Sequence, residues 1–128
     1  MPDPSATVSQ VHPGDALDLL VAGWTTLPDV AEALRLDVTR VRQQLRDHQL
    51  VALRRDGVLA VPADLLQDGR LVKGLSGLLT LLADAGFSDV EAVRWMFTAD
   101  DSLPGRPVDA LRENRGTEVR RRAQALAL

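Results

Sequence analysis

Two short helical patterns and one hairpin pattern follow one another between residues 26 and 62, and this order constrains the fold more than any other feature. Thr26 is a typical N-cap, and apolar residues recur at helical spacing over residues 27–34. Asp37 is a good N-cap for a second helix, Val38–His48, whose buried stripe consists of Val38, Val41 and Leu45. The sequence therefore predicts two helices joined by a tight turn.

The hairpin pattern comes directly after the second helix. Two apolar runs, residues 51–55 and 58–62, flank Asp56-Gly57, and these two residue types tolerate the positive φ angles of a type I′ turn. Because a lone two-stranded hairpin is marginal in water, it must pack on the preceding helices. Helix, turn, helix and hairpin is the order of a winged helix-turn-helix domain. A short helix is expected over residues 63–66.

From Lys73 onward the apolar spacing is helical throughout. One helix runs from Leu75 to Ala85 and ends at Gly86. Ser88 and Glu91 form a capping box that opens the next helix. A third helix is expected over Val108–Asn114. Gly116 is expected to break it, and Thr117 to cap a final helix.

Together these patterns predict a mainly α fold with three parts. Residues 1–14 contain three prolines and little periodicity, which is typical of a flexible tail. Residues 15–67, which begin with a short helix expected within residues 15–22, are expected to form the winged helix-turn-helix with its short β-hairpin wing. Residues 73–128 are expected to form a C-terminal helical bundle.

Composition excludes several classes of protein and site. The chain has no cysteine, which excludes disulfides, thiolate metal sites and a cysteine nucleophile. No apolar run reaches the length of about 18 residues that crosses a bilayer, and the first residues lack the pattern of a signal peptide. The expected location is therefore the cytoplasm. His12 and His48 are isolated, and no catalytic, metal or cofactor constellation is visible, so we expect no enzyme.

The positive charge is concentrated where a DNA reader needs it. The net charge of the whole chain is −3, but residues 35–55 carry six arginines against Asp37 and Asp47. Arginine suits guanine and glutamine suits adenine in the major groove, while wing arginines are placed to meet phosphates or a minor groove. The predicted DNA-binding residues are Thr39, Arg40, Arg42, Gln43 and Arg46 of the second helix, and Arg54 and Arg55 at the hairpin tip.

Double-stranded DNA is therefore the expected partner, and two alternatives stay open at this point. The same fold also serves as a protein-interaction module. RNA is the less favoured partner because the chain has no Tyr, two Phe and two Trp, which leaves few aromatic side chains for base stacking.

Residues 26–45, running into residues 51–62, resemble the excisionase and MerR-like winged helix-turn-helix class. Taken whole, the chain resembles an actinobacterial family of small DNA-binding proteins first known from mycobacteria. The segments that carry this resemblance are residues 73–82, 94–98, 106–111 and 119–125. In that family the N-terminal tail is linked to regulation by a Ser/Thr protein kinase. The resemblance implies Thr7 as the candidate phosphorylation site.

A second resemblance concerns the end of the chain only. Arg94-Trp95, residues 103–111 and Val119 are similar to the C-terminal domain of Xre-family antitoxins, which grips a toxin enzyme and mediates oligomerisation. Two functional hypotheses result. The first is a transcriptional regulator or nucleoid-associated factor. The second is an antitoxin-like protein that binds a toxin, or a second copy of itself, through this domain.

Overall fold

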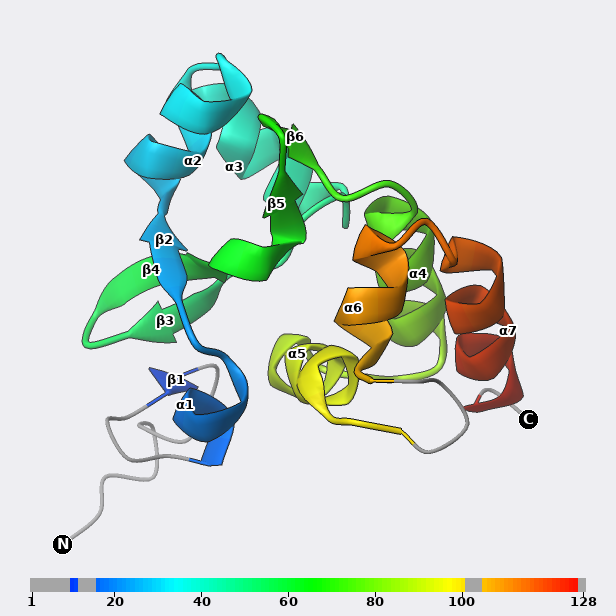
Figure 1. Cartoon of the computed structure of the whole chain (residues 1–128). Coiled ribbons are helices and arrows are strands. Elements are labelled where there is room, and N and C mark those ends of the chain that lie inside the picture. Colours follow the sequence, from blue (N-terminus) through cyan, green and yellow to red (C-terminus); the bar gives the residue numbers. More distant parts are fainter. Residues whose placement is uncertain (1–9, 12–15, 101–104, 127–128) are drawn as a thin grey trace, which may run out of the picture.

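The computed structural model describes residues 10–11, 16–100 and 105–126 and divides them into a sheet-containing half and a helical half (Figure 1). The N-terminal half contains β1 (Gln10–Val11), α1 (Ala16–Leu20), β2 (Trp24–Thr26), α2 (Leu27–Leu34), α3 (Val38–Arg46), β3 (Leu53–Arg55), β4 (Val58–Pro62), a 3₁₀ turn (Ala63–Leu65), β5 (Leu66–Gln67) and β6 (Arg70–Leu71). The C-terminal half contains α4 (Leu75–Asp84), α5 (Asp89–Phe97), α6 (Pro107–Arg112) and α7 (Gly116–Leu126).

The two helices of the winged helix-turn-helix domain (called the reader below), α2 and α3, begin at the predicted caps. The Thr26 hydroxyl accepts a hydrogen bond from the Asp29 amide at 3.3 Å, and an Asp37 carboxylate oxygen accepts one from the Arg40 amide at 2.9 Å. Each cap pairs an amide that the first helical turn leaves without a partner. Arg35 ends α2 in the left-handed conformation with φ 59°. The chain therefore turns within three residues into α3.

The wing is part of a four-stranded sheet with the strand order β1-β3-β4-β2. β3 and β4 form the predicted antiparallel hairpin, in which Arg55 pairs with Val58 across Asp56 and Gly57, both of which have positive φ. β2 adds a third, antiparallel strand in which Trp24 lies opposite Pro62. The residues just before α2 thus tie the wing to the helices, which gives the hairpin the support that it lacks alone.

One continuous core joins the two halves. Val41 of α3, Leu53 of β3, Leu78 of α4 and Val119 of α7 belong to the same cluster of buried apolar side chains. Polar contacts join the halves at the surface as well. Arg112 donates to the backbone carbonyls of Asp64 and Leu66, both at 2.8 Å. The fold is therefore mainly helical with small sheets, as predicted, and its two halves pack as one body.

Several boundaries differ from the predictions. α3 ends at Arg46 rather than His48, because His48 takes a left-handed conformation with φ 57° that directs the chain toward the buried Leu50. The predicted break at Gly116 is wrong, since the turn occurs at Asn114 with φ 64° and Gly116 begins α7. A Cβ on Gly116 would lie 3.7 Å from the Leu111 Cδ2 atom, so glycine fits this close approach of α6 and α7.

Four short strands, β1, β2, β5 and β6, were not predicted. Residues 66–71 form the hairpin β5-β6 rather than a continuation of the short helix, which is a 3₁₀ turn ending at Leu65. Gln10–Val11, inside the expected flexible tail, pair in parallel with Arg54 and Arg55 of β3. For these two residues the tail prediction is wrong, because they supply hydrogen-bond partners to the edge of β3. The remainder of the tail, including Thr7, lies outside the described residues.

Candidate nucleic-acid interface

The outer face of α3 carries the predicted DNA-reading side chains. Val41 is fully buried with 0% exposure, and Val38 and Leu45 are half-buried against the core. Helix α3 therefore packs against the core through the predicted apolar stripe. The helical period then directs the rest of the helix outward. The side chains on this exposed face are Thr39, Arg40, Arg42, Gln43 and Arg46.

These exposed side chains differ in how far they are already engaged. The Gln43 amide nitrogen donates to both carboxylate oxygens of Asp47 at 3.0 and 3.1 Å, and its oxygen accepts from Arg46 at 2.7 Å. Gln43 must therefore exchange partners before it can pair with a base. The side chains of Arg40 and Arg42 make no hydrogen bond or ion pair within the part of the chain that the structure describes. Their guanidinium groups are ready to pair with an anion.

A groove of about 300 Å³ brings α3 and the wing together. Arg42 lines it from α3 and Arg54 from β3, while Leu27 and Pro28 at the start of α2 and Leu59 of β4 form its apolar part. Arg54 donates a hydrogen bond to the Gly57 carbonyl at 3.1 Å, which holds its side chain along the wing. Two cations on the walls of one groove suit a polyanionic backbone.

Arg55 does not join this group. Successive side chains of a strand point to opposite faces, so Arg55 lies on the other side of the hairpin from Arg54. There it forms an ion pair with Asp18 of α1, and its guanidinium carbon stacks 4.6 Å from the centre of the Trp24 ring. The Arg55 side chain is only 26% exposed. The predicted set of seven residues therefore divides into six on the α3 and wing surface and one, Arg55, held against Asp18 and Trp24 on the opposite face of the wing.

Sequence reasoning missed two cations near the same helices. Arg35 is exposed at the turn between α2 and α3, and Arg70 is exposed on β6, whose strand packs against α2. For Arg70, the available sequence signal was Asp68-Gly69, an Asp-Gly pair like the one at the wing turn, Asp56-Gly57. Strands of two residues are too short to show a pattern on either side of it.

The arginines of the helical half are mostly bound within the molecule. Arg106 makes a bidentate pair with Asp109 at 2.8 and 2.9 Å and reaches Asp64 at 3.4 Å. The hydrogen bond from Arg106 holds the pKa of Asp109 below its ordinary value. Both residues belong to the antitoxin-like segment, and in this structure they hold α6 against the N-terminal half.

Residues 10–11, 16–100 and 105–126 offer neither a cluster of metal ligands nor a membrane-spanning helix. Within these ranges, no group of three or more His, Cys, Asp or Glu side chains is placed to hold a metal ion. No helix there has the length and apolar content needed to cross a membrane.

Comparison with protein-family models gives two matches that share one boundary. Residues 14–72 match the family model described as "DNA-binding protein Rv2175c, wHTH domain". Residues 72–127 match the one described as "Rv2175c C-terminal domain of unknown function". Neither description names a catalytic domain.

Similar proteins give the same result over nearly the full chain. The chain is 46% identical over 137 aligned positions to the "DNA-binding protein Rv2175c" of Mycobacterium tuberculosis (strain ATCC 25618 / H37Rv), covering 95% of this chain and 92% of that protein. Its fold is similar to the "NMR structure of Rv2175c" with a TM-score of 0.76 at 44% identity, over 83% of this chain and 82% of that chain.

Proposed function

The chain belongs to the family of the DNA-binding protein Rv2175c, and on this premise we propose that it binds double-stranded DNA through α3 and the wing. Membership of this family confirms the resemblance to small mycobacterial DNA-binding proteins. The observation that carries the proposal is the groove between α3 and the wing, which Arg42 lines from α3 and Arg54 from β3.

The proposed contacts follow from the state of each side chain. Arg40 and Arg42, which have no partner among the described residues, are the first candidates for guanine or phosphate. Arg46 and Gln43 can follow if they release one another. Thr39 and Arg54 suit phosphate contacts at the two edges of the surface. Arg55 stays with Asp18 and is outside the proposed interface.

The biological role that we propose is regulation of transcription or organisation of the nucleoid in the cytoplasm, by binding rather than by catalysis. Phosphorylation of Thr7 by a Ser/Thr kinase stays a prediction. A toxin or a second copy as the partner of residues 73–128 likewise stays a prediction. A pull-down of genomic fragments, followed by their sequencing, would identify the regulated sites.

The test is the affinity for duplex DNA as a function of salt, measured by fluorescence anisotropy. If Arg40, Arg46 and Arg54 each neutralise about one phosphate, the log–log slope against salt should be about −3. Arg121→Ala is the matched control, because it removes an exposed arginine from α7 and should leave Kd and slope unchanged. A slope near zero in the wild type would contradict the proposal.

A further inference from the structure

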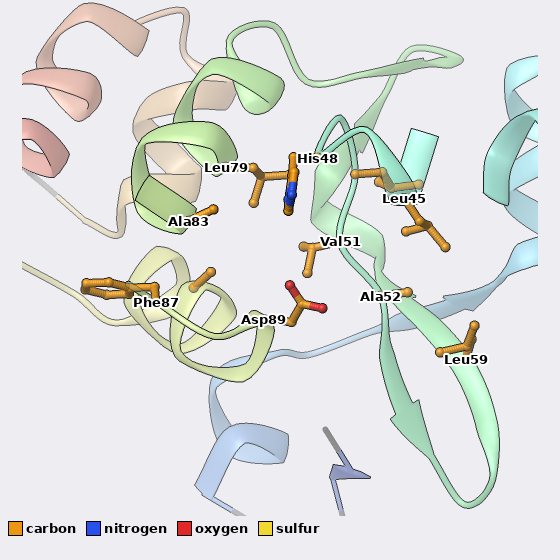
Figure 2. A pocket seen from close by; sticks show the side chains of 11 residues that line it. Leu45, His48, Val51, Ala52, Leu59, Leu79, Ala83, Phe87 and Asp89 are labelled. Carbon is orange, nitrogen blue, oxygen red and sulfur yellow. The ribbon is translucent and has the colours of Figure 1, made fainter. Parts of the chain in front are cut away.

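A second hollow lies between the two halves of the molecule, next to the groove that Arg42 and Arg54 line (Figure 2). It is a cavity of about 220 Å³. Leu45, Ala52 and Leu59 line it from the reader, and Leu79, Ala83 and Phe87 line it from the helical half. The continuous core described above therefore does not fill the whole boundary between the halves.

The cavity combines apolar walls with one carboxylate. Figure 2 shows His48 and Asp89 on opposite sides of Val51, with both side chains directed into the space. Neither makes a hydrogen bond or ion pair within the described ranges. Neither lysine nor arginine lines the cavity, so with His48 neutral at pH 7 the Asp89 carboxylate is the one charged group of the lining. A cationic group on an otherwise apolar ligand would complement this lining.

The size of the cavity limits the ligand. A protein cavity of about 150 Å³ accommodates benzene. A volume of about 220 Å³ therefore suits one aromatic ring or branched alkyl group with a short chain. A drug-sized molecule would be too large, since such ligands occupy pockets of roughly 300 Å³ or more.

The cavity shares a wall with the proposed DNA groove. Leu59 lines both spaces, and its cross-strand partner on the same face of the hairpin is Arg54. Leu45 lies three positions after Arg42 on α3, so the two side chains are neighbours on that helix. A ligand that moves Leu45 or Leu59 would therefore shift the two arginines that line the groove.

We propose that this cavity binds a small protonated amine carrying one aromatic or branched alkyl group, with the ammonium facing Asp89. Its occupancy changes the geometry of the groove and hence the DNA affinity. The effect on DNA affinity rests on the proposed function, whereas the binding of the amine does not.

The site is tested on the full chain without DNA, by amide chemical shifts during titration with 2-phenylethylamine. We expect saturable shifts at Leu79, Ala83 and Ala52, with a Kd of about 1 mM for a probe of this size. Asp89→Asn should weaken binding about fivefold. Ala83→Phe should fill the cavity and abolish binding. Phenylacetate, which has the same ring and the opposite charge, should cause no such shifts.

Two results would overturn the site. The first is that 2-phenylethylamine, isoamylamine and benzylamine all give no saturable shifts at the lining residues. The second is that binding is equally strong in Asp89→Asn and in the wild type, since the charge then plays no part. Asp89→Asn leaves the core untouched, so the test holds even if Ala83→Phe fails to fold.

The coupling is tested by DNA anisotropy with and without a saturating amount of the amine. On adding the amine, we expect the Kd of the wild type for DNA to change by more than about threefold, a threshold set below the range typical of allosteric coupling. In Ala83→Phe the amine should change this Kd little. If the amine fills the cavity and the DNA affinity does not change, the coupling is overturned, while the amine-binding site stands. Absence of DNA binding with or without the amine would overturn the proposed function, while the titration still decides the site.

Discussion

The arginines of the two halves are used in different ways. In the reader, Arg40 and Arg42 project from α3 without a partner among the described residues. In the helical half, Arg106 forms an ion pair with Asp109, and Arg112 donates hydrogen bonds to two backbone carbonyls of the N-terminal half. The side chains are chemically identical, so the difference lies in what surrounds them. Free arginines are available for a ligand, whereas paired ones hold the fold together.

The largest expected effect is the loss of stability in Arg112→Ala. The change leaves the carbonyls of Asp64 and Leu66 without their charged donor and should cost about 2–3 kcal/mol in the free energy of unfolding. Urea denaturation followed by circular dichroism measures it. The matched control is Arg42→Ala, which should change stability by less than about 0.5 kcal/mol. Equal losses in the two variants would break the comparison.

The second prediction concerns DNA affinity. Replacing both groove arginines, in Arg42→Ala/Arg54→Ala, should raise Kd about 30-fold and make the salt slope less negative by about one, from the phosphate contact of Arg54. The folded structure should persist, because neither side chain is buried. Anisotropy titrations against one selected duplex and one scrambled duplex measure this effect. Arg121→Ala is the control, and a double variant that binds as tightly as it does would show that the groove is not the interface.

The single variants sharpen this prediction. Arg42→Ala should reduce the preference for the selected duplex, whereas Arg54→Ala should weaken both duplexes alike, because phosphate contacts carry no direct sequence information. Gln43→Ala should behave like Arg42→Ala, provided that Gln43 leaves Asp47 on binding.

A third, smaller effect concerns acid stability. Because the pKa of Asp109 in the folded protein lies below its ordinary value of 3.8, the ionised carboxylate stabilises the fold at neutral pH. This contribution is lost as the pH falls below that ordinary value and through the lower folded-state value. Asp109→Asn should therefore be less stable than the wild type near neutral pH. The difference should shrink toward about pH 3 in urea denaturation; a constant difference would contradict the paired state of Asp109.

The smallest expected effect belongs to Arg55→Ala. Arg55 pairs with Asp18 and stacks on Trp24, contacts that are worth about 1 kcal/mol at partly exposed sites. We expect a small loss of stability and an unchanged salt slope for DNA binding. If the slope instead changed by one unit, Arg55 would leave Asp18 to meet a phosphate, and the sequence-based assignment of Arg55 to the interface would be restored.

The sequence allowed prediction wherever the deciding interaction is local. The caps Thr26 and Asp37, the capping box at Ser88 and the turn at Asp56-Gly57 each involve residues within three positions of one another. The exposed face of α3 follows from the period of one helix. These local signals predicted most of the reader and placed its polar face.

What escaped prediction depends on contacts between distant residues. The fate of Arg55 is decided by Asp18, which lies 37 positions away. Strand β2 forms because β4 offers it a partner. The hairpin at Asp68-Gly69 is an exception: it is local, but its strands of two residues each are too short to show a pattern. The cavity beside Leu59 depends on how the two halves meet. Neither residue type nor spacing reports such an arrangement.

The most direct test of the difference between the two groups of arginines is an NMR titration of the protein with duplex DNA, observing the arginine Nε–H signals. We expect large shifts for Arg40, Arg42 and Arg54, and unchanged signals for Arg106 and Arg112, which stay bound to their protein partners. Amide signals of α3 and the wing should shift with them, and those of α7 should not. Shifts concentrated on α6 and α7, with α3 and the wing silent, would contradict the account.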